Sequence, residues 1–136
     1  APAHPIGIWV GAYGPRMLGL IGRLADGWVP SASYMPPERL AGAQARIDAA
    51  AAEAGRDPAA IRRLYNISGR IGPGGGGFLE GPAAQWVEQL LPLVTETGMD
   101  TFVLWAAESP ASQLERFAAE VAPALREAVA AHRGGG

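Results

Sequence analysis

The residues best suited to binding chemistry form one short turn between an apolar segment and a predicted helix. The turn consists of Gly11, Ala12, Tyr13, Gly14, Pro15 and Arg16. Pro15 suits the first position of a helix, where its fixed φ is already helical and its missing N–H has no partner to lose. The free N–H groups of a first helical turn, together with the positive end of the helix dipole, attract anions.

Two features beside this helix start favour a phosphate as the anion. Gly11 and Gly14 allow a tight turn and a close approach of the backbone. The planar guanidinium of Arg16 presents a fork of donors that matches a phosphate. The residues thus predict a phosphate cradle over 11–16. They leave open an ordinary strand-to-helix turn with a solvated arginine.

The sequence contains no complete set of residues for thiol chemistry, for a metal site or for a lysine-dependent phosphate loop. The chain has no cysteine, and its two histidines, His4 and His132, lie near opposite ends and lack the spacing of metal ligands. All 11 basic residues are arginine, so a phosphate-binding loop that needs lysine is excluded. Glu80 and Glu108 are the carboxylates expected near the ends of strands, and a solvated role is favoured for each.

A second glycine-rich stretch matches a dinucleotide fingerprint only formally. Gly72, Gly74 and Gly77 have the spacing G-x-G-x-x-G after a predicted strand. No helix opens directly after the glycines, and no acidic residue stands where the ribose contact should come. A flexible insertion is the favoured interpretation.

Length and charge narrow the class of protein. The 136 residues suit one ordinary domain, 1–136, and the formal net charge of −2 with scattered arginines argues against a nucleic-acid partner. No apolar run approaches the roughly 18 residues that a membrane span needs. No signal peptide opens the sequence, so a soluble cytoplasmic protein is the expectation.

The elements that must position the turn alternate between strands and helices, which indicates an α/β fold with parallel strands. Helices are predicted from Pro15, from Pro37 or Glu38, from Gly81-Pro82, and from Ser109-Pro110, with Ser109 as the cap. The predicted strands lie near residues 6–12, 27–30, 64–71 and 101–106.

Three segments together resemble the carboxyl-terminal half of luciferase-like monooxygenases. They are Trp9–Leu18, Gly22–Trp28 and Gly98–Leu104, and the resemblance extends over about Ile6–Arg126. These enzymes are (β/α)8 barrels that use FMN or the deazaflavin coenzyme F-420. The resemblance implies that the loop 11–16 follows the fifth barrel strand and holds the cofactor phosphate.

The sequence departs from this family in its length. A full barrel needs roughly 250 residues, so the resemblance implies half of a (β/α)8 TIM barrel, strands five to eight, without the strands that carry most catalytic residues of the family. The main hypothesis is the cofactor-phosphate-binding half of a flavin or deazaflavin oxidoreductase. Two alternatives stay open: a non-catalytic half-barrel that self-assembles, and a small anion-binding domain of other function.

A four-stranded half-barrel also predicts a partner. Its two edge strands would be apolar and unguarded, and inward residues such as Ile8, Val10, Ile67 and Val103 would meet water. We therefore expect a homodimer or pairing with a complementary half-barrel.

Overall fold

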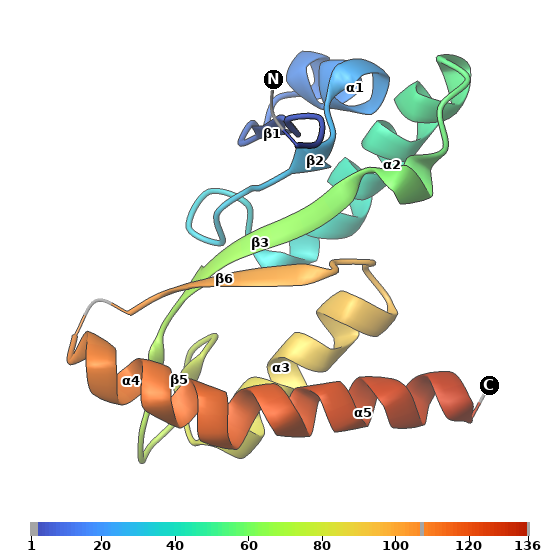
Figure 1. Cartoon of the computed structure of the whole chain (residues 1–136). Coiled ribbons are helices and arrows are strands. Elements are labelled where there is room, and N and C mark those ends of the chain that lie inside the picture. Colours follow the sequence, from blue (N-terminus) through green and yellow to red (C-terminus); the bar gives the residue numbers. More distant parts are fainter. Residues whose placement is uncertain (1–2, 107, 136) are drawn as a thin grey trace. The chain divides into compact units, whose positions relative to one another are not determined.

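The computed structural model describes residues 3–106 and 108–135, and the chain falls into two compact units. Unit 1 consists of Ala1–Asn66 and Met99–Val103, and unit 2 of Ile67–Gly98 and Leu104–Gly136. Figure 1 labels the elements of both units. The units are described separately below.

Unit 1 alternates strands and helices as predicted. Its elements are β1 (Trp9–Val10), α1 (Pro15–Leu24), β2 (Gly27–Trp28), α2 (Pro37–Glu53), a 3₁₀ turn (Pro58–Ala60), most of β3 (Arg62–Ser68) and the start of β6 (Thr101–Trp105).

A four-stranded parallel sheet in the order β1-β2-β3-β6 organises these elements. In the register, Trp9 lies opposite Gly27, and Gly27 lies opposite Arg62. The predicted order of four parallel strands alternating with helices is confirmed. The first strand is shorter than predicted, Trp9–Val10 instead of residues 6–12. β1 lies at an edge of the sheet and has a single neighbour to pair with.

Helix α1 packs closely against α2, as Figure 1 shows at the N-terminal part of the ribbon. Leu18 and Ile21 of α1 and Leu40 and Ile47 of α2 are buried. Gly22 permits the close approach, because a Cβ there would collide with the carbonyl oxygen of Ile47 and lie 2.8 Å from the Cβ of Ala50. The larger core residues of unit 1 also include Trp28, Met35, Ile61, Leu64 and Tyr65.

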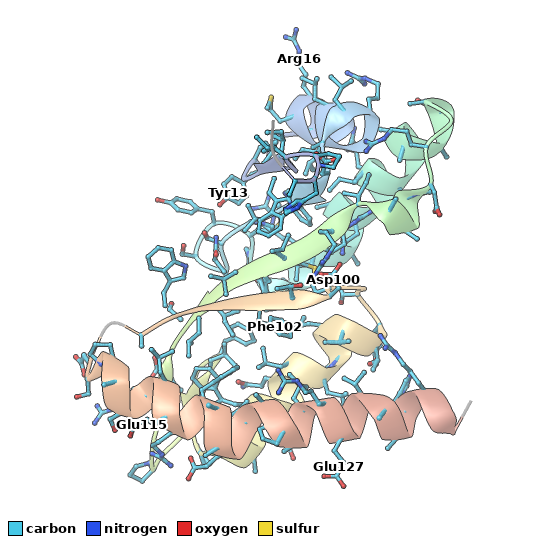
Figure 2. All side chains as sticks on the ribbon, in the orientation of Figure 1. Tyr13, Arg16, Asp100, Phe102, Glu115 and Glu127 are labelled. Carbon is cyan, nitrogen blue, oxygen red and sulfur yellow. The ribbon has the colours of Figure 1, made fainter. Side chains whose placement is uncertain are left out.

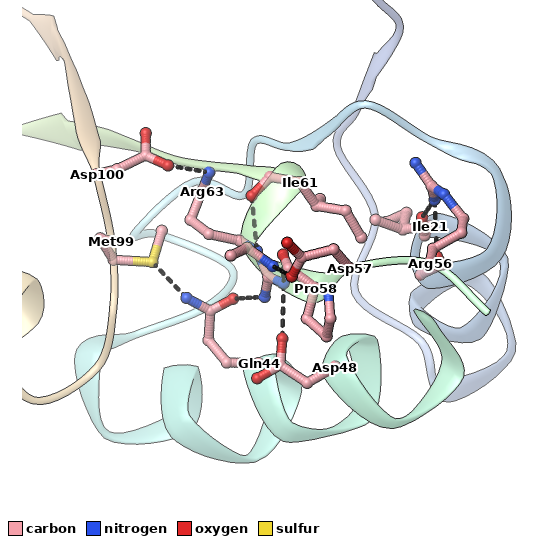
Figure 3. A network of polar contacts seen from close by, with 12 residues as sticks. Ile21, Gln44, Asp48, Arg56, Asp57, Pro58, Ile61, Arg63, Met99 and Asp100 are labelled. Atoms are coloured by element: carbon pink, nitrogen blue, oxygen red, sulfur yellow. Dashed lines mark hydrogen bonds and ion pairs between the residues drawn. The ribbon is translucent and has the colours of Figure 1, made fainter. Parts of the chain in front are cut away.

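Two arginines fasten the amino-terminal side of the sheet, and Figure 3 shows their contacts. The guanidinium of Arg56 donates to the carbonyls of Gly22 (2.7 Å) and Ala25 (2.8 Å), so a cation satisfies the free carbonyls at the end of α1. Arg63 is only 7% exposed and donates to Gln44 Oε1 and to Asp48 Oδ1, both at 2.6 Å.

The same network extends to the strand that follows in the sheet. Gln44 also donates to the sulfur of Met99, and the backbone N–H of Arg63 donates to Asp100 Oδ2 at 2.8 Å. The network therefore holds α2, β3 and the segment that leads into β6 together (Figure 3).

Unit 2 contains the ends of β3 and β6 and a set of helices. Its further elements are β4 (Arg70–Ile71), β5 (Glu80–Gly81), α3 (Ala83–Thr95), α4 (Pro110–Arg116), a π-helical segment (Phe117–Val121) and α5 (Ala122–Gly134). The β4–β5 pair is parallel and was not predicted.

Two sequence expectations in unit 2 need correction. Ser109 does not cap α4 with its side chain; it has a left-handed φ of 45°, and Pro110 starts the helix. Ile67 is only 1% exposed, so the prediction that it would meet water is wrong. Flexibility of the glycine-rich loop stays a prediction, and just after the loop Gln89 Oε1 accepts from the N–H of Leu79 at 2.7 Å.

Candidate cofactor-phosphate site

The predicted cradle lies where β1 ends and α1 begins, at the carboxyl edge of the sheet in unit 1. β1 ends at Val10, the loop runs from Gly11 to Gly14, and α1 begins at Pro15 as predicted. Carboxyl edges of parallel strands are where ligands bind in barrel and open α/β folds. The position in the fold therefore fits a ligand site.

The backbone at this turn presents unused donors. Leu18 donates to the carbonyl of Gly14 at 2.9 Å, which is the first hydrogen bond of α1. Within the described part of the chain, the N–H groups of Tyr13, Gly14, Arg16 and Met17 have no hydrogen-bond partner. No acidic residue occupies the first turn of α1. The donors are thus available to an anion at the positive end of the helix.

Gly11 and Gly14 were both expected to allow a tight turn and a close approach of the backbone, and the structure supports this only for Gly11. Gly14 has an ordinary extended backbone, with φ −75° and ψ 152°, and a Cβ there would meet nothing within 4 Å. The fold itself therefore does not need glycine at 14. A Cβ on Gly11 would come within 3.1 Å of the carbonyl oxygen of Val29. The backbone of Val29 therefore lies close to Gly11, as expected for a turn glycine.

Arg16 is exposed and points outward from α1 (Figure 2). Its guanidinium has no hydrogen bond or ion pair with any described residue, in contrast to Arg56 and Arg63. The side chain is therefore free to turn toward a ligand.

The loop after β2, residues 30–34, contacts the cradle and is called the second loop below. The sequence did not predict this contact. The hydroxyl of Tyr13 accepts a hydrogen bond from the N–H of Ser31 at 3.1 Å, and the Tyr13 ring packs against that of Tyr34 with centroids 5.6 Å apart. The buried indole of Trp28 donates to the carbonyl of Ala12 at 2.8 Å. The loops that follow β1 and β2 are thus fixed to each other.

This second loop is tied in turn to β3. Asn66 donates through Nδ2 to the hydroxyl of Ser31 (3.2 Å), and its carbonyl accepts from the N–H of Ala32 (2.9 Å). Further along, the hydroxyl of Tyr65 donates to the carbonyl of Met35. Burial, with a smaller contribution from the carboxylate of Glu38, raises the pKa of the Tyr65 phenol. The second loop is therefore held by buried or half-buried polar groups of β3.

The chemistry that this arrangement supports is binding. Its polar side chains are the hydroxyls of Tyr13, Ser31, Ser33 and Tyr34 and the guanidinium of Arg16, without a carboxylate or histidine in the loops 11–16 and 30–34. The carboxylates of unit 1 with hydrogen bonds, Asp26, Asp48, Asp57 and Asp100, bond to backbone N–H groups or to arginine. The loops can hold an anion and contain no carboxylate or histidine for acid–base catalysis.

Within the described residues, none of the helices is long and apolar enough to cross a membrane.

The sequence resembles known proteins over the part that contains the cradle. The family model described as luciferase-like monooxygenase matches residues 1–72, which include the cradle and the second loop. A phthiodiolone/phenolphthiodiolone dimycocerosates ketoreductase of Mycobacterium kansasii is 48% identical over 54 residues, 40% of this chain and 14% of the relative.

Solved structures resemble a larger part of the chain. An F-420-dependent secondary alcohol dehydrogenase, in complex with an F-420–acetone adduct, matches with a TM-score of 0.77 and 15% identity over 91% of this chain. A riboflavin lyase with modified FMN and riboflavin matches with a TM-score of 0.71 and 14% identity over 88%. The chain spans 50% and 42% of these two proteins, so it corresponds to about half of a TIM-barrel enzyme.

The family model matches more than half of the sequence, and the parallel strand order agrees with that assignment. The chain belongs to the luciferase-like monooxygenase family.

Proposed function

We propose that this chain is the cofactor-phosphate-binding half of a flavin- or deazaflavin-dependent oxidoreductase, with the phosphate at 11–16. The observation that carries the proposal is the set of unpaired N–H groups of Tyr13, Gly14, Arg16 and Met17 at the start of α1. One of the structural neighbours above depends on coenzyme F-420 and the other holds a modified FMN, and both cofactors contain a phosphate.

The residues of the chain would position the cofactor and leave redox chemistry to its ring. The backbone donors and Arg16 would bind the phosphate, and the Tyr13–Ser31 hydrogen bond would keep the second loop beside it. A bound flavin or deazaflavin would supply hydride or electron transfer. Since loops 11–16 and 30–34 contain no carboxylate or histidine, the main proton-transfer groups are expected outside them.

Completion of the barrel by a second half is the other part of the proposal. β1 is an edge strand, and its apolar neighbourhood is open to water: Ile6, Ile8 and Trp9 are 75%, 58% and 54% exposed. An unpaired apolar edge favours pairing with another strand. The second half is a complementary half-barrel or, as the competing possibility, another copy of this chain acting without catalysis.

Fluorescence titration of FMN and of coenzyme F-420 with the purified chain tests the cofactor role. Saturable binding is expected, and Arg16→Ala should weaken it by about 1.5–3 kcal/mol because a hydrogen bond to a charged group is lost. Arg23→Ala, which removes an exposed arginine from the last turn of the same helix, is the control and should leave the affinity unchanged.

Sedimentation at micromolar concentration tests the partner. A dimer of this chain, or a complex formed on addition of a complementary half, is expected. A compact monomer that melts cooperatively and binds no cofactor would refute both parts of the proposal.

A further inference from the structure

A second candidate binding site lies in unit 2 and shares no residue with the cradle. The short strands β4 and β5, with the glycine-rich loop between them, enclose an open cavity of about 390 Å³. Arg70 and Glu80 line it together with the loop, and every lining residue falls between 70 and 81. The cavity is therefore formed by one continuous segment of the chain.

The loop around this cavity is held in shape by side chains from α3. Gln85 donates through Nε2 to the carbonyls of Gly77 (3.1 Å) and Glu80 (3.2 Å). A Cβ on Gly75 would lie 2.6 Å from Oε1 of the same Gln85, so a larger residue there would displace the end of this anchoring side chain. The buried Leu79 is held at a left-handed φ of 59°, a conformation unfavourable for leucine.

The start of the loop is fastened by α4. Gln113 accepts from the N–H of Ile71 at 2.8 Å and donates to its carbonyl at 3.2 Å. Arg116 donates to the same carbonyl at 2.9 Å. Both ends of the loop are thus fixed, so the cavity is a built feature of unit 2.

Two opposite charges line the cavity without pairing. Arg70 and Glu80 are directly opposite in the β4–β5 register, and their side chains lie on the exposed face of the pair while Ile71 and Gly81 are buried. Neither side chain has an ion pair or hydrogen bond with another described residue. The backbone N–H groups of Gly74, Gly75 and Gly76 likewise have no partner among the described residues.

We propose that this cavity binds the carboxylate or phosphate group of a small molecule, with Arg70 as its main contact. The guanidinium provides up to five N–H donors, and glycine backbone lets further N–H groups approach an anion closely. Glu80 opposes the anion by like charge and sets the affinity low, which suits a ligand that must leave again. The proposal goes beyond the cofactor-phosphate role of the cradle and does not depend on it.

Amide NMR of the whole chain, titrated with sodium phosphate and separately with sodium acetate at constant ionic strength, tests the proposal. The amides of Gly74–Gly76 should shift saturably. Shifts with phosphate alone identify a phosphate site, and shifts with both identify a general oxyanion site. Amides 13–17 report the cradle in the same spectra, so the two sites are read independently.

Three variants test how each charge affects the affinity for the anion. Arg70→Gln should weaken binding at the loop about tenfold or more, whereas Glu80→Gln should strengthen it because the opposing charge is gone. Arg126→Gln removes an exposed arginine of α5 in the same unit and should change nothing.

Absence of saturable shifts in the loop would overturn the proposal, as would unchanged binding in Arg70→Gln or weaker binding in Glu80→Gln. If Arg70→Gln does not fold, the affinity of Glu80→Gln decides: tighter anion binding supports the proposal, and weaker or unchanged binding overturns it.

Discussion

The hydroxyl of Tyr13 accepts a hydrogen bond from the backbone N–H of Ser31 across a sequence separation of 18 residues. This contact joins the loop after β1 to the loop after β2 at the carboxyl edge of the sheet. Among the described residues, Tyr13 contacts that second loop through this hydrogen bond and through the packing of its ring on Tyr34. The geometry of the proposed phosphate site depends on it.

Tyr13→Phe should therefore loosen the cradle. Loss of one half-buried hydrogen bond is expected to lower the free energy of unfolding by about 1 kcal/mol and to weaken FMN binding. Urea unfolding and fluorescence titration measure the two effects. Tyr34→Phe is the matched control, because the Tyr34 hydroxyl has no hydrogen-bond partner among the described residues; an equal loss in both variants would contradict the role given to Tyr13.

Gly22→Ala should destabilise unit 1. Its new methyl group would collide with the Ile47 carbonyl and crowd Ala50, so α1 and α2 must move apart. Overpacking of this kind costs about 1–3 kcal/mol. Gly42→Ala is the control: it lies in α2 with nothing within 4 Å of the added Cβ, and it should stabilise the helix by up to about 1 kcal/mol. Thermal or urea unfolding of the pair would contradict the packing account if the two changes had the same sign.

The adjacent arginines of β3 should differ sharply. Arg63→Leu removes the donor to the buried Oε1 of Gln44, and about 1–3 kcal/mol of stability should be lost. Asp48, whose side chain is 51% exposed, loses the same cation but stays hydrated. Arg62→Leu breaks an ion pair with Asp100 whose two side chains are 56% and 40% exposed, and the expected loss is below about 1 kcal/mol. Urea midpoints decide: similar losses in both variants would show that the Arg63 network does not hold unit 1 together.

Alkaline pH should destabilise the fold through Tyr65. Its pKa is raised in the folded chain, so above the ordinary tyrosine pKa of about 10 the unfolded chain loses a proton that the folded chain keeps. The stability associated with this phenol is complete below that pH and declines as the pH rises past it. Urea unfolding between about pH 9 and pH 11 should show the decline, and Tyr65→Phe should flatten it. An identical slope in Tyr65→Phe would remove Tyr65 as its cause.

Local signals in the sequence predicted the helix starts well. Helices α1, α2 and α4 begin at Pro15, Pro37 and Pro110, because proline fixes the φ that a first helical residue needs. Gly55 follows α2 with a left-handed φ of 73°, a conformation that glycine adopts readily at the end of a helix. Strand lengths were predicted less well, since pairing with neighbours sets them: β1 forms over only two residues at the edge of the sheet.

The contacts that shape the sites could not be predicted, because each joins distant positions through a long side chain. Arg56 reaches the carbonyl of Gly22 34 residues earlier, and Gln113 reaches Ile71 across 42 residues. No periodicity or local motif encodes such pairs. The Tyr13–Ser31 contact is of the same kind, because it joins two loops across 18 residues.

The N–H groups at the start of α1 are proposed to hold the phosphate of a flavin-type cofactor. Amide NMR of the chain with FMN, compared with riboflavin, which has the same ring and no phosphate, measures this most directly. The account predicts saturable shifts of the Tyr13, Gly14, Arg16 and Met17 amides with FMN and much smaller shifts with riboflavin. Equal shifts with both ligands, or FMN binding that leaves these four amides unchanged, would contradict it.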